Sequence, residues 1–187
     1  MDADSKLVVS WALGDRSANV AVPFIADLAG RLSHRAQLTT DGHRAYLEAV
    51  EGAFGSGIDY AILNKVYGFP TQPEVRYSPP ECIGVNMKVI TGNPDPVHIS
   101  TSFIERQNWS VRTSMRRYTR LSNGFSRKSE NHAAAVALNY FAYNFIKIHR
   151  TLKMTPAMAA GVTTKLWEVS DLVALWESYE CDEKLAA

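Results

Sequence analysis

Cysteine is scarce in this sequence, and long apolar runs are missing. The two cysteines among 187 residues, Cys82 and Cys181, stand in no metal-site spacing. No apolar run reaches the roughly 20 residues that a membrane-crossing helix needs. The first residues, Met-Asp-Ala-Asp-Ser-Lys, lack the basic-then-apolar layout of a signal peptide. These absences predict a cytoplasmic chain with free thiols and no membrane partner.

A large net charge is also missing, because the formal total is only +1. This near-neutral total is the sum over a chain that contains two segments of opposite charge. The cationic segment, residues 106–128, has seven cations and no acid: Arg106, Arg112, Arg116, Arg117, Arg120, Arg127 and Lys128. The acidic segment, residues 167–183, has six acids and no cation: Glu168, Asp171, Glu177, Glu180, Asp182 and Glu183. The cationic segment suits either a polyanion such as DNA or a solvated helix face.

What the sequence does contain is a folded α/β pattern, with 46% hydrophobic residues. Short apolar runs predict strands, and apolar residues at spacings of three and four predict helices. The predicted order is a strand over 6–14, a helix over 18–32, a strand over 36–40, a helix over 43–54 and a strand over 60–66. This alternation predicts a parallel sheet covered by helices.

The second half of the chain has a different composition. Residues 67–96 hold six of the eight prolines and one strand-like stretch, 87–90, which predicts an inserted loop with a hairpin. Helices are then predicted over 102–120, 129–150 and 163–179. We therefore divide the chain into residues 1–66 (part of an α/β core), 67–98 (the insertion) and 99–187 (a helical part).

Asp41 is the first candidate functional residue. It follows the predicted strand 36–40 directly, in TTDGHRAY. Ligands of open α/β sheets bind at the carboxyl ends of strands, and Gly42 leaves room for a close approach. The alternative is a plain Asp-Gly turn, or a cap of the next helix.

Glu105 is the second candidate. It lies in STSFIERQN, where Ser102-x-x-Glu105 also fits a capping box that closes on the Ser102 backbone N–H. At helical spacing, Glu105 shares a face with Asn108, Arg112 and Arg116. A carboxylate beside such cations suits a metal ion next to a phosphate.

Three segments in this order resemble one family. They are TTDGHRAYLEAV, the ERQN segment with its arginines, and YN-x-x-x-x-H-x-x-L-x-x-TPA, which spans 143–157. Together they resemble the catalytic core of DDE-type insertion-sequence transposases, which has a ribonuclease-H-like fold. The resemblance covers nearly the whole chain and identifies Asp41 as the second catalytic acid and Glu105 as the third.

The resemblance implies DNA transposition, with Asp41 and Glu105 as ligands of Mg²⁺ or Mn²⁺. Two such ions activate the attacking oxygen and stabilise the leaving oxygen of a phosphodiester, and carboxylates are their preferred ligands. It implies a bacterial protein of the nucleoid that binds transposon ends and target DNA, and a possible homo-oligomer. The expected DNA-binding residues are Arg106, Asn108, Arg112, Arg116, Arg117, Arg120, Arg127 and Lys128.

The first acid of that family has no match here. In the family it stands on the first strand of the core, whereas Met1–Ser5 matches a later hairpin turn and 6–14 the third strand. We expect Asp2 and Asp4 to be turn residues, and the chain to be an N-terminally incomplete core that is inactive alone. A non-catalytic DNA-binding remnant and a small α/β enzyme unrelated to DNA are the alternatives.

Overall fold

The computed structural model describes residues 1–68, 81–118, 124 and 128–186, and the chain falls into two compact units. The sheet unit comprises Ser10–Glu105, and the helical unit comprises Met1–Val9 together with Arg106–Ala187. The three-part division by sequence pattern stays a prediction.

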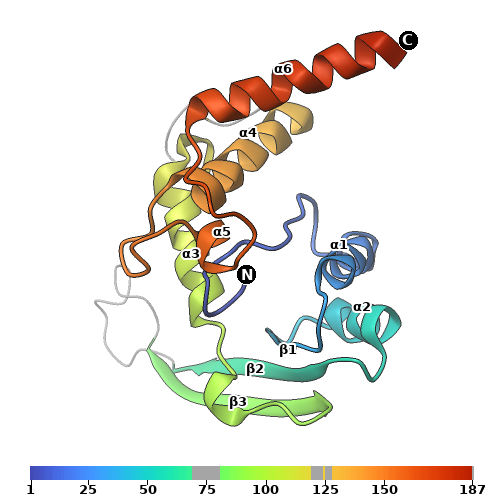
Figure 1. Ribbon diagram of the computed structural model, residues 1–187. Coiled ribbons are helices and arrows are strands. Elements are labelled where there is room, and N and C mark those ends of the chain that lie inside the picture. Colours follow the sequence, from blue (N-terminus) through green and yellow to red (C-terminus); the bar gives the residue numbers. More distant parts are fainter. Residues whose placement is uncertain (69–80, 119–123, 125–127, 187) are drawn as a thin grey trace. The chain divides into compact units, whose positions relative to one another are not determined.

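The sheet unit is built on a mixed sheet whose three described strands have the order β1-β2-β3 (Figure 1). β1 (Gln37–Thr40) runs parallel to β2 (Asp59–Tyr67), and β3 (Cys82–Thr91) runs antiparallel to β2. The predicted strands over 36–40 and 60–66 are therefore confirmed. The strand-like stretch 87–90 is the end of a longer strand, β3, and residues 69–80 of the insertion lie outside the described residues.

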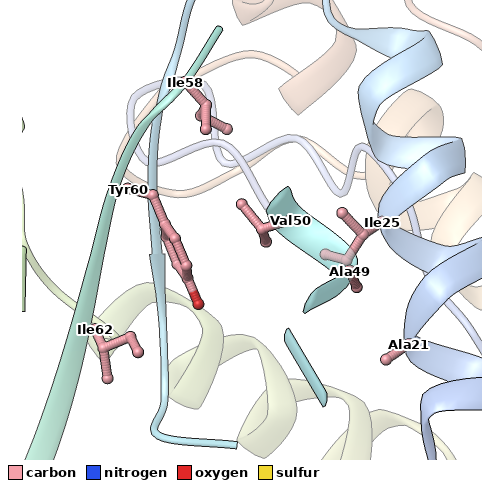
Figure 2. Packing of buried hydrophobic residues seen from close by; sticks show 7 residues of the cluster. All are labelled: Ala21, Ile25, Ala49, Val50, Ile58, Tyr60 and Ile62. Carbon is pink, nitrogen blue, oxygen red and sulfur yellow. The ribbon is translucent and has the colours of Figure 1, made fainter. Parts of the chain in front are cut away.

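Two helices cover one face of this sheet. α1 (Ala18–Arg31) and α2 (Ala45–Phe54) form where the apolar spacing predicted them. Side chains from α1, α2, β2 and the residue before β2 make the core, as Figure 2 shows: Ala21, Ile25, Ala49, Val50, Ile58, Tyr60 and Ile62. Full burial of one isoleucine or valine contributes roughly 1.5–3 kcal/mol, so this cluster holds the sheet unit together.

The strand predicted over 6–14 is wrong, since no residue from Lys6 to Gly14 is in a strand. The physical reason is visible at Val8. Its backbone N–H donates to Oδ1 of Asn144 over 3.0 Å, and its carbonyl accepts from Nδ2 of the same side chain over 3.0 Å. One buried amide therefore takes the place of the neighbouring strand that the prediction required.

The second half of the chain follows the predicted helix order, but α3 and α4 end earlier than predicted and α6 begins and ends later. Along the chain come η1 (Pro96–His98), α3 (Ser102–Ser114), η2 (Arg116–Tyr118), α4 (Ser129–Phe141), the π-helical turn η3 (Ala142–Ile146), α5 (Pro156–Ala159) and α6 (Val169–Ala186). α3 begins in the sheet unit and continues into the helical unit. Over the described residues, six α-helices and a mixed sheet confirm the α/β class.

Candidate functional site

Asp41 stands at the carboxyl end of β1, directly after Thr40, the last residue of the strand. Its Oδ1 accepts from the backbone N–H of His43 over 3.2 Å, so the predicted turn forms. Its Oδ2 lies 3.5 Å from a guanidinium nitrogen of Arg16. α2 begins later, at Ala45, so Asp41 does not cap it, and its carboxylate stays 56% exposed.

Gly42 is held against β2. A Cβ at this position would lie 2.2 Å from Oδ1 of Asn64, so the space beside Gly42 is filled by an amide. The room expected there for a ligand is taken by this side chain. The Asn64 side chain of β2 thus lies directly beside the loop that follows β1.

Glu105 lies in the first turn of α3 and has both oxygens engaged. Oε1 accepts from the Thr101 hydroxyl over 2.7 Å, and Oε2 contacts the Lys65 ammonium at 2.5 Å. The predicted capping box is wrong, because the Ser102 N–H donates to Ser100 Oγ instead. The carboxylate is therefore directed at a lysine from β2 rather than at the backbone of its own helix.

Packing on β2 explains why Glu105 reaches Lys65. Ile99 is 7% exposed and buries against Ala61 and Leu63. These two residues alternate with Tyr60 and Ile62, so they occupy the face of β2 opposite the α1/α2 core. Lys65 lies on the same face of β2 as Ala61 and Leu63. Because Ile99 packs on that face, the start of α3 lies near the Lys65 ammonium group.

The structure therefore brings both predicted acids to one end of the parallel pair. Asp41 follows Thr40, which stands opposite Ile62, and Lys65 lies three positions beyond Ile62. Each acid has its own cation: Arg16, which precedes α1, for Asp41, and Lys65, on the opposite face of the sheet, for Glu105. As site residues, Asp41 and Glu105 stay predictions.

The ion pair favours the ionised form of Glu105. The hydrogen bond from Lys65 lowers the pKa of the Glu105 carboxyl, partial burial opposes this, and the Thr101 hydroxyl lowers it further. The same bond raises the pKa of the Lys65 ammonium. Both groups are charged at neutral pH.

A divalent metal ion fits this arrangement only in part. Carboxylates are the donors that Mg²⁺ and Mn²⁺ prefer. Among the described residues, however, no group of three His, Cys, Asp or Glu side chains stands close enough to hold a metal ion. A complete site therefore needs donors beyond Asp41 and Glu105. The Asp2 carboxylate accepts from the backbone N–H and the hydroxyl of Ser5, in the turn that the sequence predicted.

The predicted DNA-binding residues have different surroundings. Arg106 lies over the Trp109 ring, 4.7 Å from its centroid. The expected face from Glu105 to Arg116 is interrupted, because α3 ends at Ser114 and Arg116 belongs to the separate turn η2. The other described members are exposed: Asn108 and Arg112 on α3, Arg117 in η2, and Lys128 before α4. Arg120 and Arg127 lie outside the described residues.

Sequence reasoning missed the partners of the two acids. The sequence pattern assigned none of Lys65, Thr101 and Arg16 to an acid. The signal for Lys65 is its register, since it shares a face of β2 with Leu63. No sequence signal pairs Arg16 with Asp41, because that contact depends on where α1 begins.

Two further features of the described residues concern the cysteines and the helices. Cys82 and Cys181 are free and exposed thiols. The helices of the described residues are all too short or too polar to cross a membrane. Comparison of the chain with protein-family models, with curated proteins and with solved structures gives no match.

Proposed function

We propose that this chain is part of the ribonuclease-H-like catalytic core of a DDE-type insertion-sequence transposase, with Asp41 as its second acid and Glu105 as its third. The observation that supports this most is that Asp41 directly follows β1 and that Glu105 contacts Lys65 toward the carboxyl end of β2. Ligands of α/β sheets bind at that edge. The segment order on which the resemblance depends agrees with this geometry.

DNA is the proposed partner, in a bacterial nucleoid. Arg112 and Arg116 are exposed, and the cationic segment to which they belong contains no acid to neutralise them. Contacts with phosphates supply most of the affinity for DNA without regard to sequence. Lys65 is engaged with Glu105, so among the described residues we assign the DNA contacts to the exposed cations of α3 and η2.

By itself the chain binds DNA without cleaving it. Cleavage and strand transfer with Mg²⁺ require a carboxylate in addition to Asp41 and Glu105. The second candidate function is a non-catalytic DNA-binding remnant of a transposase. The observation that favours it is the pairing of each acid with a cation, which neutralises the charge that a metal ion would need.

DNA binding is tested with a fluorescent 20-base-pair duplex and anisotropy at low salt. The double variant Arg116→Ala, Arg117→Ala is expected to weaken binding about tenfold, since two phosphate contacts are lost. Arg150→Ala, an exposed arginine outside the cationic segment, is the matched control and leaves the affinity unchanged. Equal affinity for all three proteins would contradict the proposal.

Supercoiled plasmid separates the two candidates. Incubated with Mg²⁺ or Mn²⁺, the chain alone is expected to leave the plasmid intact under either candidate. A fragment that carries a core strand with a further catalytic acid is then added. If nicking appears on this addition and is lost in Glu105→Gln, the chain is part of a catalytic core. If no nicking appears, the result supports a non-catalytic DNA-binding remnant. Nicking by the chain alone would overturn the incompleteness of the site.

A further inference from the structure

β3 forms one edge of the described sheet. It pairs with β2 on one side, and no described strand pairs with it on the other (Figure 1). The pairing is regular from Gly84 to Val89, because both irregularities in the register lie outside this stretch. Proteins commonly protect such an edge with proline or with several charged side chains, but the ten residues of β3 contain no proline and one charged residue, Lys88. The free edge of β3 can therefore accept a further strand.

Four apolar residues of β3 share one face of the strand, since side chains alternate between the two faces. They form the apolar row: Ile83, Val85, Met87 and Val89. Their exposed fractions are 67%, 48%, 55% and 53%, respectively. Lys65 of β2 stands opposite Val85 on this face, and its ammonium group is paired with Glu105. The apolar row is therefore exposed, and the cation beside it is already neutralised.

β3 is complementary to its own antiparallel copy. If two copies of β3 pair with Asn86 opposite Asn86, Ile83 of each copy stands opposite Val89 of the other, and Val85 stands opposite Met87. Side-chain pairs across neighbouring strands stabilise an antiparallel sheet. All four residues of the apolar row thus meet an apolar partner on the same face of the joined sheet.

The single charged residue of β3 is compatible with this register. Lys88 of each copy stands opposite Gly84 of the other, so the two ammonium groups do not face each other. A shift of two residues in one direction would set Val89 opposite Glu81. The same shift in the other direction would also leave one residue of the apolar row without an apolar partner. Pairing centred on Asn86 is therefore the two-fold arrangement that matches all four apolar residues.

We propose that β3 pairs antiparallel with β3 of a second copy of this chain, about a two-fold axis that passes between the two Asn86 residues. The two sheets then join into one, with the order β1-β2-β3-β3-β2-β1 for the described strands. Such a contact uses the same surface of both copies, so a strand that matches itself needs no second kind of partner. Backbone hydrogen bonds supply the affinity, and the apolar row selects the register. This inference does not depend on the proposed function, and none of the proposed DNA-binding residues lies on β3.

Disulfide cross-linking of the full chain tests the register. In a background of Cys82→Ser and Cys181→Ser, Asn86→Cys places two thiols directly opposite each other, where β-carbons lie about 4.5–5.5 Å apart, close to disulfide distance. Lys88→Cys is the matched control on the same face of β3. Its two thiols would lie four residues apart along the strands, about 14 Å, which is too far for a disulfide. After oxidation with diamide, Asn86→Cys is expected to give at least about tenfold more covalent dimer than Lys88→Cys.

Sedimentation velocity measures the contribution of the apolar row. Met87→Lys and Val85→Glu each set a charge opposite an apolar residue of the second copy, so each is expected to raise the dimer dissociation constant about tenfold. In an equimolar mixture, the introduced cation of one variant stands opposite the introduced acid of the other, and a dimer of the two variants forms. Val162→Lys, at a 59% exposed apolar residue of the helical unit, is the control and leaves the dimer intact.

Circular dichroism establishes that every variant keeps its secondary structure. A chain that stays monomeric at all concentrations would leave the edge of β3 to a strand of another protein and would overturn the pairing. Equal cross-linking of Asn86→Cys and Lys88→Cys would overturn the register. A mixture of Met87→Lys and Val85→Glu that stays monomeric would contradict the opposition of these two positions.

Discussion

The buried interior of the sheet unit differs in composition from that of the helical unit. Both clusters of buried hydrophobic side chains among the described residues lie in the sheet unit. The helical unit instead holds four of the five buried polar residues: Ser5, Gln107, Asn144 and Thr155. The proposed acids therefore stand on a frame of apolar packing, whereas α3, which carries proposed DNA-binding cations, buries Gln107 together with Val111.

The largest expected effect tests the helical unit. Asn144→Ala removes both hydrogen bonds to Val8 and leaves a buried N–H and a buried carbonyl without partners. The free energy of unfolding is expected to fall by about 2–4 kcal/mol. Urea unfolding followed by tryptophan fluorescence measures this, since three of the four tryptophans, Trp109, Trp167 and Trp176, belong to the helical unit. The exposed Asn131→Ala is the control and should change little.

The second prediction tests the frame of the sheet unit. Gly92 has φ +72°, and a Cβ there would lie 2.1 Å from Oδ1 of Asp59 and 3.0 Å from the Ile58 carbonyl. Gly92→Ala is expected to cost about 1–3 kcal/mol, measured by thermal unfolding. Gly30→Ala, in an open position of α1, should be neutral or gain up to about 1 kcal/mol. Equal stabilities of the two variants would contradict the close contact at Gly92.

The sequence predicted the sheet unit better than the helical unit, for a physical reason. Alternating and helical spacings of apolar residues indicate which side chains are buried. Burial of such side chains stabilises the elements of the sheet unit: β1, β2, α1 and α2. The segment 6–14 has the same apolar spacing, yet a strand exists only where a neighbour pairs with it, and Asn144 supplies that pairing from far along the chain. Local pattern cannot foresee such a contact.

The candidate site shows the same limit. Asp41 was placed correctly at a strand end, because the end of an apolar run is a local signal. The contact of Glu105 with Lys65 depends on Ile99 packing against β2, which no spacing between positions 65 and 105 reveals. The predicted face through Arg116 failed because α3 ends two residues earlier, at Ser114, where nothing in the charge pattern marks a stop.

A smaller effect concerns pH. The hydrogen bond from Arg35 and that from the Asn93 N–H lower the pKa of Asp59 to about 2, from an ordinary value of 3.8. The stability from this carboxylate is thus fully present above pH 3.8 and is lost as the pH falls through 2. Asp59→Asn should lower Tm at pH 6, and its difference from the wild-type Tm should shrink as the pH falls through 2. The exposed Asp27→Asn serves as a comparison with a weaker pH dependence.

The smallest effect concerns Glu105 itself. Lys65→Met removes the hydrogen bond that lowers the pKa of the Glu105 carboxyl, so that pKa is expected to rise toward its ordinary value. Carbon-13 NMR of the glutamate carboxyls, with Glu105→Gln to assign the signal, measures the titration. An unchanged Glu105 titration would show that the ion pair with Lys65 is absent in solution.

The dependence of DNA affinity on salt tests the central claim most directly. If the described arginines of α3 and η2 contact phosphates, log K should fall with log salt at a slope of about −4, because each contact contributes roughly −0.9. Arg116→Ala with Arg117→Ala should reduce this slope by about 2. A wild-type affinity that is undetectable at low salt, or that does not change with salt, would contradict a DNA-binding part of a transposase.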